Sequence, residues 1–161
     1  MACEPGNDPS LVRTYIVPHE HVGLRDAHPG VWTSDCSSAY EAAKIDGRMV
    51  IIFYGDHEGC GYSRQLEKYT EDVRFLNWAA ANGIYLVVAD ASRSIDCGKA
   101  KEEFVRLGKL AGISTGGTPA FAMVDPNDLN KALGGHVGSS FNSVEELESY
   151  IASFLGGGTP L

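Results

Sequence analysis

The sequence predicts an α/β fold in which helices flank a central β-sheet. Two segments, 49–55 and 84–90, are near-continuous apolar runs rich in β-branched and aromatic residues. Such runs are typical of strands that are buried on both faces of a sheet. The chain between them has helical character, so the two strands form a βαβ unit in which they run parallel and the connection is right-handed.

The chain is expected to begin with an extended lead-in, residues 1–31. Proline and glycine recur along it and leave room for one short strand at most, over 13–17. The next element is predicted to be a helix. Ser38 and Glu41 have the spacing of a capping box at its start, and Gly47 provides the stop at its end.

The helical connection between the two buried strands is predicted in two parts. The first part covers 62–69 and the second covers 71–82, with Thr70 as the N-cap of the second helix and Gly83 as its end. After the second buried strand comes a polar stretch over 91–98 that has no periodic pattern. This stretch is predicted to be an insert at the edge of the sheet.

The C-terminal part of the chain predicts a further helix, two strands and a last helix, over 99–112, 118–126, 131–135 and 143–155. The first of these strands begins at a Thr-Pro pair. Proline lacks the donor needed in a sheet and is therefore confined to edges and strand starts. At this position it suggests a cis peptide bond in a tight turn.

Composition and charge fit one ordinary soluble domain. Apolar residues make up 43% of the chain and charged residues 21%, close to average usage. We divide the chain into the lead-in 1–31, a domain over 32–155 and a flexible tail, 156–161. A net charge of −8 without any Lys/Arg cluster argues against nucleic-acid binding. No apolar run approaches the length of about 18 residues that a membrane-spanning helix needs.

The principal candidate for chemistry is Cys60. It follows a buried strand and opens a helix, where unpaired N–H groups and the helix dipole favour a thiolate. The thiolate is the form that attacks disulfides. Ser63 lies on the same helix face and is able to donate its hydroxyl to the sulfur, and a protonated His57 would also stabilise the thiolate. The alternative interpretation of Cys60 is a buried, inert cysteine.

Two segments together resemble the thioredoxin-like superfamily, in its one-cysteine (Cys-x-x-Ser) type. "VIIFYGDHEGCGYSRQLE", 50–67, resembles the strand, active-site loop and helix, and "GTPAFAMVDP", 117–126, resembles the strand with the cis-proline. The resemblance covers about 32–155 and implies a central mixed sheet. It also implies that Cys60 is the exposed attacking cysteine and that Ser63 occupies the resolving position. The residues that it places in contact with substrate are Gly61, Tyr62, Thr118 and Pro119.

By this resemblance, the protein would exchange disulfides through mixed disulfides with protein thiols. It would act as an isomerase, as a thiol-dependent reductase or as a covalent holder of client chains. Glutathione is the candidate exchange thiol, and no other cofactor and no metal is expected. Gly59 stands where the family commonly has tryptophan, and the central strand carries Tyr54 rather than an acid. These departures favour the alternative, a non-catalytic protein-binding module.

The other cysteines are Cys3, Cys36 and Cys97. The parallel topology places Cys36 and Cys97 at the same sheet edge as Cys60. Three arrangements stay open: a Cys36–Cys97 disulfide, a disulfide of Cys60 with either of them, or three free thiols. Cys3 opens a polar stretch that resembles the mature N-terminus of a bacterial lipoprotein; otherwise it is an accidental cysteine in a frayed tail. A lipid anchor would favour an extracytoplasmic location, either periplasmic or secretory, over a cytoplasmic one.

Overall fold

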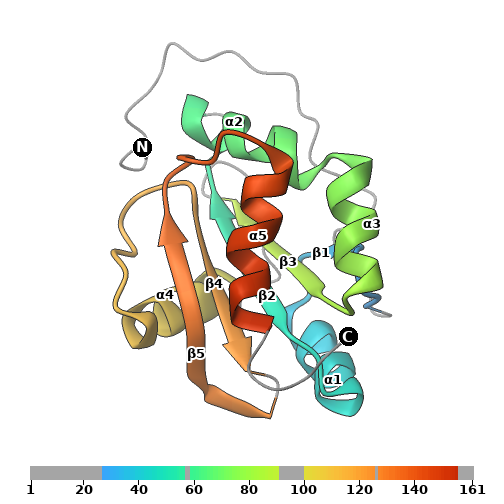
Figure 1. Ribbon diagram of the computed structural model, residues 1–161. Helices are drawn as coiled ribbons and strands as arrows, with labels where there is room; N and C mark the ends of the chain where they lie inside the picture. The colour runs from blue at the N-terminus through green and yellow to red at the C-terminus, as the bar shows by residue number, and fades with distance from the viewer. Residues whose placement is uncertain (1–26, 57–58, 91–99, 126, 156–161) are drawn as a thin grey trace.

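The fold is a five-stranded mixed β-sheet with helices on both faces (Figure 1). The computed structural model describes residues 27–56, 59–90, 100–125 and 127–155. The predicted strand at 13–17, the polar stretch 91–98 and the predicted tail 156–161 lie outside these residues.

The strands lie in the order β1-β3-β2-β4-β5 across the sheet. They are β1 (Trp32–Thr33), β2 (Val50–Gly55), β3 (Tyr85–Asp90), β4 (Ala120–Asp125) and β5 (Asp128–Val137). The central strand β2 pairs in parallel with β3, as the βαβ pattern predicts, and antiparallel with β4. The sequence does not predict β1, because two residues at an edge produce no periodic pattern.

The five helices divide between the two faces of the sheet. They are α1 (Cys36–Asp46), α2 (Gly61–Thr70), α3 (Val73–Ala81), α4 (Ala100–Ala111) and α5 (Val144–Leu155). Helices α1 and α4 pack on one apolar layer of the sheet, and α3 and α5 pack on the other. Helix α2 continues from the end of β2 and lies across the top of the sheet in Figure 1. No helix among the described residues combines the length and the apolar character needed to cross a membrane.

Two of the predicted N-caps are wrong, and in both cases a nearby aspartate takes the position. Asp35 caps α1, where its carboxylate accepts hydrogen bonds from the N–H of Ser38 at 3.0 Å and from the Ser38 hydroxyl at 3.1 Å. Asp72 caps α3 by accepting from the N–H of Arg74 at 2.8 Å, whereas Thr70 is the last residue of α2. A carboxylate satisfies the free N–H groups and also interacts favourably with the helix dipole.

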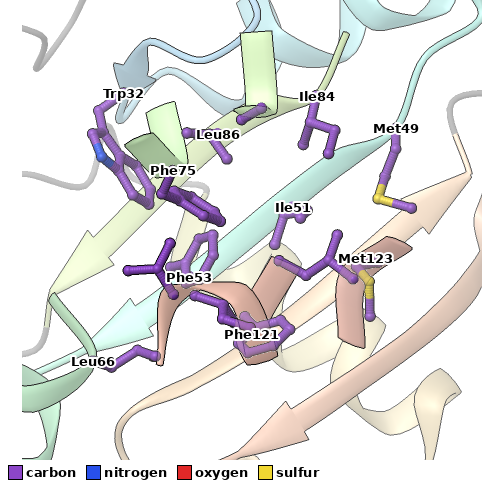
Figure 2. Close-up of a cluster of buried hydrophobic side chains, with 14 of the residues drawn as sticks. Trp32, Met49, Ile51, Phe53, Leu66, Phe75, Ile84, Leu86, Phe121 and Met123 are labelled. Atoms are coloured by element: carbon purple, nitrogen blue, oxygen red, sulfur yellow. The ribbon is translucent and has the colours of Figure 1, made fainter. Parts of the chain in front are cut away.

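The apolar layer beneath α3 and α5 contains most of the large side chains of the protein (Figure 2). Ile51 and Phe53 of β2 and Phe121 of β4 belong to this cluster together with Phe75 of α3 and residues of α5. The indole N–H of Trp32 donates to the carbonyl of Thr70 at 3.2 Å. Strand β1 is thereby tied to the end of α2, which fixes α2 relative to the sheet.

Candidate functional site

Cys60 lies between the central strand and α2, next to the start of β4. It is the N-cap of α2 and has an extended backbone, and its carbonyl accepts from the N–H of Ser63 at 3.2 Å and of Arg64 at 3.4 Å. Its Sγ lies 3.5 Å from the carbonyl oxygen of Thr118. The Thr118–Pro119 peptide bond is cis. The structure thus brings the cysteine motif and the Thr-Pro pair together, although they are far apart in the sequence.

The state of Cys60 differs from the expectation. The residue is disulfide-bonded and 0% exposed, so the exposed attacking cysteine implied by the resemblance is not what the structure contains. Cys36, the first residue of α1, is not part of a disulfide and is buried in the layer between the sheet and helices α1 and α4. A Cys36–Cys97 disulfide and three free thiols are therefore both wrong. Cys3 and Cys97 lie outside the described residues, as does His57, the candidate modulator of the Cys60 pKa.

Ser63 interacts with the loop that precedes Cys60. Its hydroxyl oxygen accepts a hydrogen bond from the N–H of Asp56 at 3.0 Å, and the residue is 1% exposed. The predicted bond from this hydroxyl to the Cys60 sulfur would use its O–H as donor, which accepting from Asp56 does not occupy. Ser63 is thus a buried acceptor that connects the first turn of α2 with the end of β2.

Asp56, the residue after β2, is a buried acid that the sequence patterns do not single out. It is 3% exposed, and its Oδ1 accepts from the N–H of Gly59 at 2.9 Å. A Cβ on residue 59 would lie 2.4 Å from Oδ2 of Asp56, so this position accepts glycine and excludes tryptophan. The sequence predicts no acid in the central strand because Tyr54 occupies it, but the acid stands two residues later. An aspartate at a strand end with glycine three residues on is the signal for this turn.

The exposed face of α2 forms a groove with a volume of about 410 Å³ beside Cys60. Its lining residues are Gly61, Tyr62, Arg64, Gln65 and Lys68. They recur three or four positions apart and therefore share one side of the helix. The groove holds two cationic side chains on a chain whose net charge is −8. A second cavity, on the buried side of α2, measures only about 30 Å³, which is room for a water or two rather than for a substrate.

The loop after β5 supports the site from the other side. The N–H of Gly138 donates to the carbonyl of Pro119 at 2.7 Å, and the hydroxyl of Ser139 donates to Oε1 of Gln65 at 2.9 Å. These bonds connect β5, the cis-proline and α2. Within the described part of the chain, no group of three or more His, Cys, Asp or Glu residues is able to hold a metal ion.

Acidification is expected to destabilise the domain through His136 of β5. Burial against Phe141 and Tyr150, at ring distances of 4.7 and 5.3 Å, lowers the pKa of His136 below its ordinary 6.5. Near and below that value the unfolded chain binds more protons than the folded one, so stability falls as the pH drops. The free energy of unfolding, measured in urea at about pH 7.5 and about pH 5, should differ less between the two pH values in His136→Gln than in the parent protein. Replacing the exposed His28 by glutamine serves as the control, and equal pH dependence in both variants would contradict the prediction.

The described architecture is a thioredoxin-like fold. A disulphide isomerase from Xylella fastidiosa Temecula1 superposes with a TM-score of 0.50 at 16% identity, over 74% of this chain and 87% of that one. A structure titled DsbH oxidoreductase superposes with a TM-score of 0.57 at 13% identity, over 90% of this chain and 93% of that one. No protein-family model matches the chain, and no curated protein does. At these identities the likeness establishes the fold.

Proposed function

We propose that this protein carries out thiol–disulfide exchange through Cys60 as its single active-site cysteine. One observation carries the proposal: the cysteine at the start of α2, 3.5 Å from the carbonyl that precedes Pro119, is itself engaged in a disulfide. The names of the two structural neighbours, a disulphide isomerase and an oxidoreductase, support the same general chemistry.

Once reduced, Cys60 lies at the N-terminus of α2, where free N–H groups and the helix dipole favour its thiolate. The thiolate attacks a client disulfide, forms a bond between its own sulfur and one client sulfur, and releases the other client sulfur as a thiolate. A second thiolate then attacks the mixed disulfide and restores Cys60. When the second thiolate belongs to the client, the client disulfide is isomerised. When two glutathione molecules serve in turn, the client is reduced and glutathione is oxidised. Ser63 takes no covalent part because it has no sulfur.

A protein-binding module without catalysis is the second candidate, and the complete burial of Cys60 favours it. A sulfur that is 0% exposed and held in a disulfide must be reduced and uncovered before it attacks anything. In such a module, the groove on α2 with Tyr62 at its start would be a contact surface. Protein thiols or disulfides would be partners of the exchange protein, and an extracytoplasmic location would suit a persistent disulfide.

Alkylation of the native protein across a pH series distinguishes the two candidates. The protein is treated with a mild thiol reductant and alkylated, and the labelled peptides are assigned by mass spectrometry. An exchange site gives Cys60 labelling well below about pH 8, while the buried Cys36 stays unlabelled. A Cys60 disulfide that survives reductant in the native protein, or a thiol that reacts only at alkaline pH, would assign the domain to the binding class. Peptide mapping without reductant identifies the cysteine bonded to Cys60.

The groove on α2 predicts a preference for anionic exchange partners such as glutathione. The reduced protein should react about two- to fivefold faster with dithiodipropionate, a dianion, than with cystamine, a dication, at low salt. Lys68→Glu should remove this preference, because Lys68 lines the groove. Lys109→Glu, on the exposed surface of α4, is the matched control. Unchanged rate ratios in Lys68→Glu would show that the groove does not select by charge.

A further inference from the structure

We propose that Asp56 is a positioning residue for Cys60, which it holds at the start of α2 through hydrogen bonds to Gly59, Cys60 and Ser63. This inference rests on the proposed exchange function and names a residue that this function requires. Asp56 itself makes no contact with substrate in the proposal. It acts through the main chain of the residues that carry the cysteine.

Three hydrogen bonds connect Asp56 with the loop and with the first turn of α2. Its side-chain Oδ1 accepts from the N–H of Gly59 at 2.9 Å, and its main-chain carbonyl accepts from the N–H of Cys60 at 2.9 Å. Its own N–H donates to the hydroxyl oxygen of Ser63 at 3.0 Å. One residue thus fixes the position before the cysteine, the cysteine itself and the first turn of the helix that follows.

Losing these hydrogen bonds would cost stability because the groups that make them are buried. Asp56 is 3% exposed and Ser63 is 1% exposed, so neither has water as a ready substitute partner, and an unmade buried hydrogen bond costs more than a made one contributes. The carboxylate also packs directly on Gly59, where even a methyl group would lie 2.4 Å from Oδ2. The glycine before the cysteine and the acid after the strand are therefore complementary features of one turn.

The same geometry gives the serine of the Cys-x-x-Ser motif a structural role. Its oxygen accepts from a buried N–H at 3.0 Å, a distance at which a larger sulfur atom would crowd the donor, and sulfur is also the weaker acceptor. Ser63 is thus part of the support of Cys60. The absence of a second sulfur at position 63 follows from the turn that Asp56 builds.

The carboxylate has an electrostatic effect that a purely packing role would lack. It lies against Gly59, the neighbour of Cys60, so its negative charge opposes the thiolate while the start of α2 favours it. Asp56→Asn keeps an oxygen for the N–H of Gly59 and removes the charge. Asp56→Ala removes both, so the two variants separate positioning from charge.

The first test is amide hydrogen exchange, which does not depend on thiol chemistry. In the full-length protein, Asp56→Ala should accelerate exchange at the amides of Gly59 and Cys60 at least about tenfold, since their loop loses its anchor. Asp56→Asn should leave both amides close to the parent protein. The control is Asp128→Ala, because Asp128 is exposed and its Oδ1 accepts from the N–H of Asn130 at 3.0 Å in a similar turn. Unchanged protection in Asp56→Ala, or equal loss in both Asp56 variants, overturns the proposal.

The second test is the pH profile of disulfide exchange by the reduced protein. Asp56→Asn should move the midpoint of the profile to lower pH and keep the limiting rate at high pH, whereas Asp56→Ala should lower the limiting rate about tenfold or more. Identical midpoints and limiting rates in all three proteins overturn the proposal. If Asp56→Ala fails to fold, the comparison of Ser63→Ala with Ser63→Thr tests the same support. If the parent shows no exchange, the proposed function fails, and the amide measurement still decides the role of Asp56.

Discussion

Cys60→Ser is expected to abolish mixed-disulfide formation, with a loss of at least about a thousandfold in rate, because a serine hydroxyl is not ionised at neutral pH and forms no disulfide. The assay incubates the reduced protein with glutathione disulfide and follows the mass of the glutathione adduct. The cysteine bonded to Cys60 is released as a thiol in this variant, and peptide mapping shows whether it forms any adduct in place of Cys60.

Cys36→Ala is the matched control for that experiment. Cys36 is 2% exposed and lies in the layer between the sheet and helices α1 and α4, so its loss should leave the exchange rate within about twofold. Its removal should cost some stability, as the loss of a small buried side chain does. Persistent adduct formation in Cys60→Ser, or its loss in Cys36→Ala, would show that the reactive sulfur has been misassigned.

Phe121→Ala is expected to lower the free energy of unfolding by about 3–5 kcal/mol, among the largest effects of any single substitution in this domain. Phe121 is 0% exposed, and its ring centroid lies 5.1 Å from that of Phe53 and 6.1 Å from that of Tyr150. Figure 2 shows Phe121 and Phe53 facing one another in the buried layer. The substitution leaves a cavity where the sheet meets α5, one residue away from Ala120, the first residue of β4.

Urea unfolding monitored by far-UV circular dichroism measures this effect. The control is Val73→Ala, because Val73 is 69% exposed and should change the unfolding free energy by less than about 0.5 kcal/mol. A loss below about 2 kcal/mol in Phe121→Ala would mean that the core collapses around the missing ring, and the packing argument would not hold.

The elements that the sequence predicts well carry long, uniform patterns. The two buried strands, now β2 and β3, are apolar along their whole length, and their parallel pairing follows from the helical connection. Cys60 at the opening of α2 follows from the same local order of strand and helix. Such features depend on neighbouring residues only, so periodicity and capping rules find them.

The remaining features depend on chain segments that meet only after folding. The hydrogen bond between Ser139 and Gln65 joins residues 74 positions apart, and no sequence pattern in either segment predicts it. The disulfide state of Cys60 is likewise set by which sulfur comes within reach. The misplaced caps have a different cause, since Asp35 and Asp72 stand close to the predicted Ser38 and Thr70, and helix ends are defined only to within a residue or two.

The buried thiol of Cys36 provides an internal reference for measuring how the domain opens. It lies on the face of the sheet covered by α1 and α4, while Leu66 of α2, the helix that Cys60 caps, packs on the opposite layer. A reagent should therefore reach Cys36 only when the whole domain unfolds, and should reach reduced Cys60 whenever the local site opens. Two labelling rates from one sample then report the motion of the loop and the cooperative unfolding of the domain separately, without any added probe.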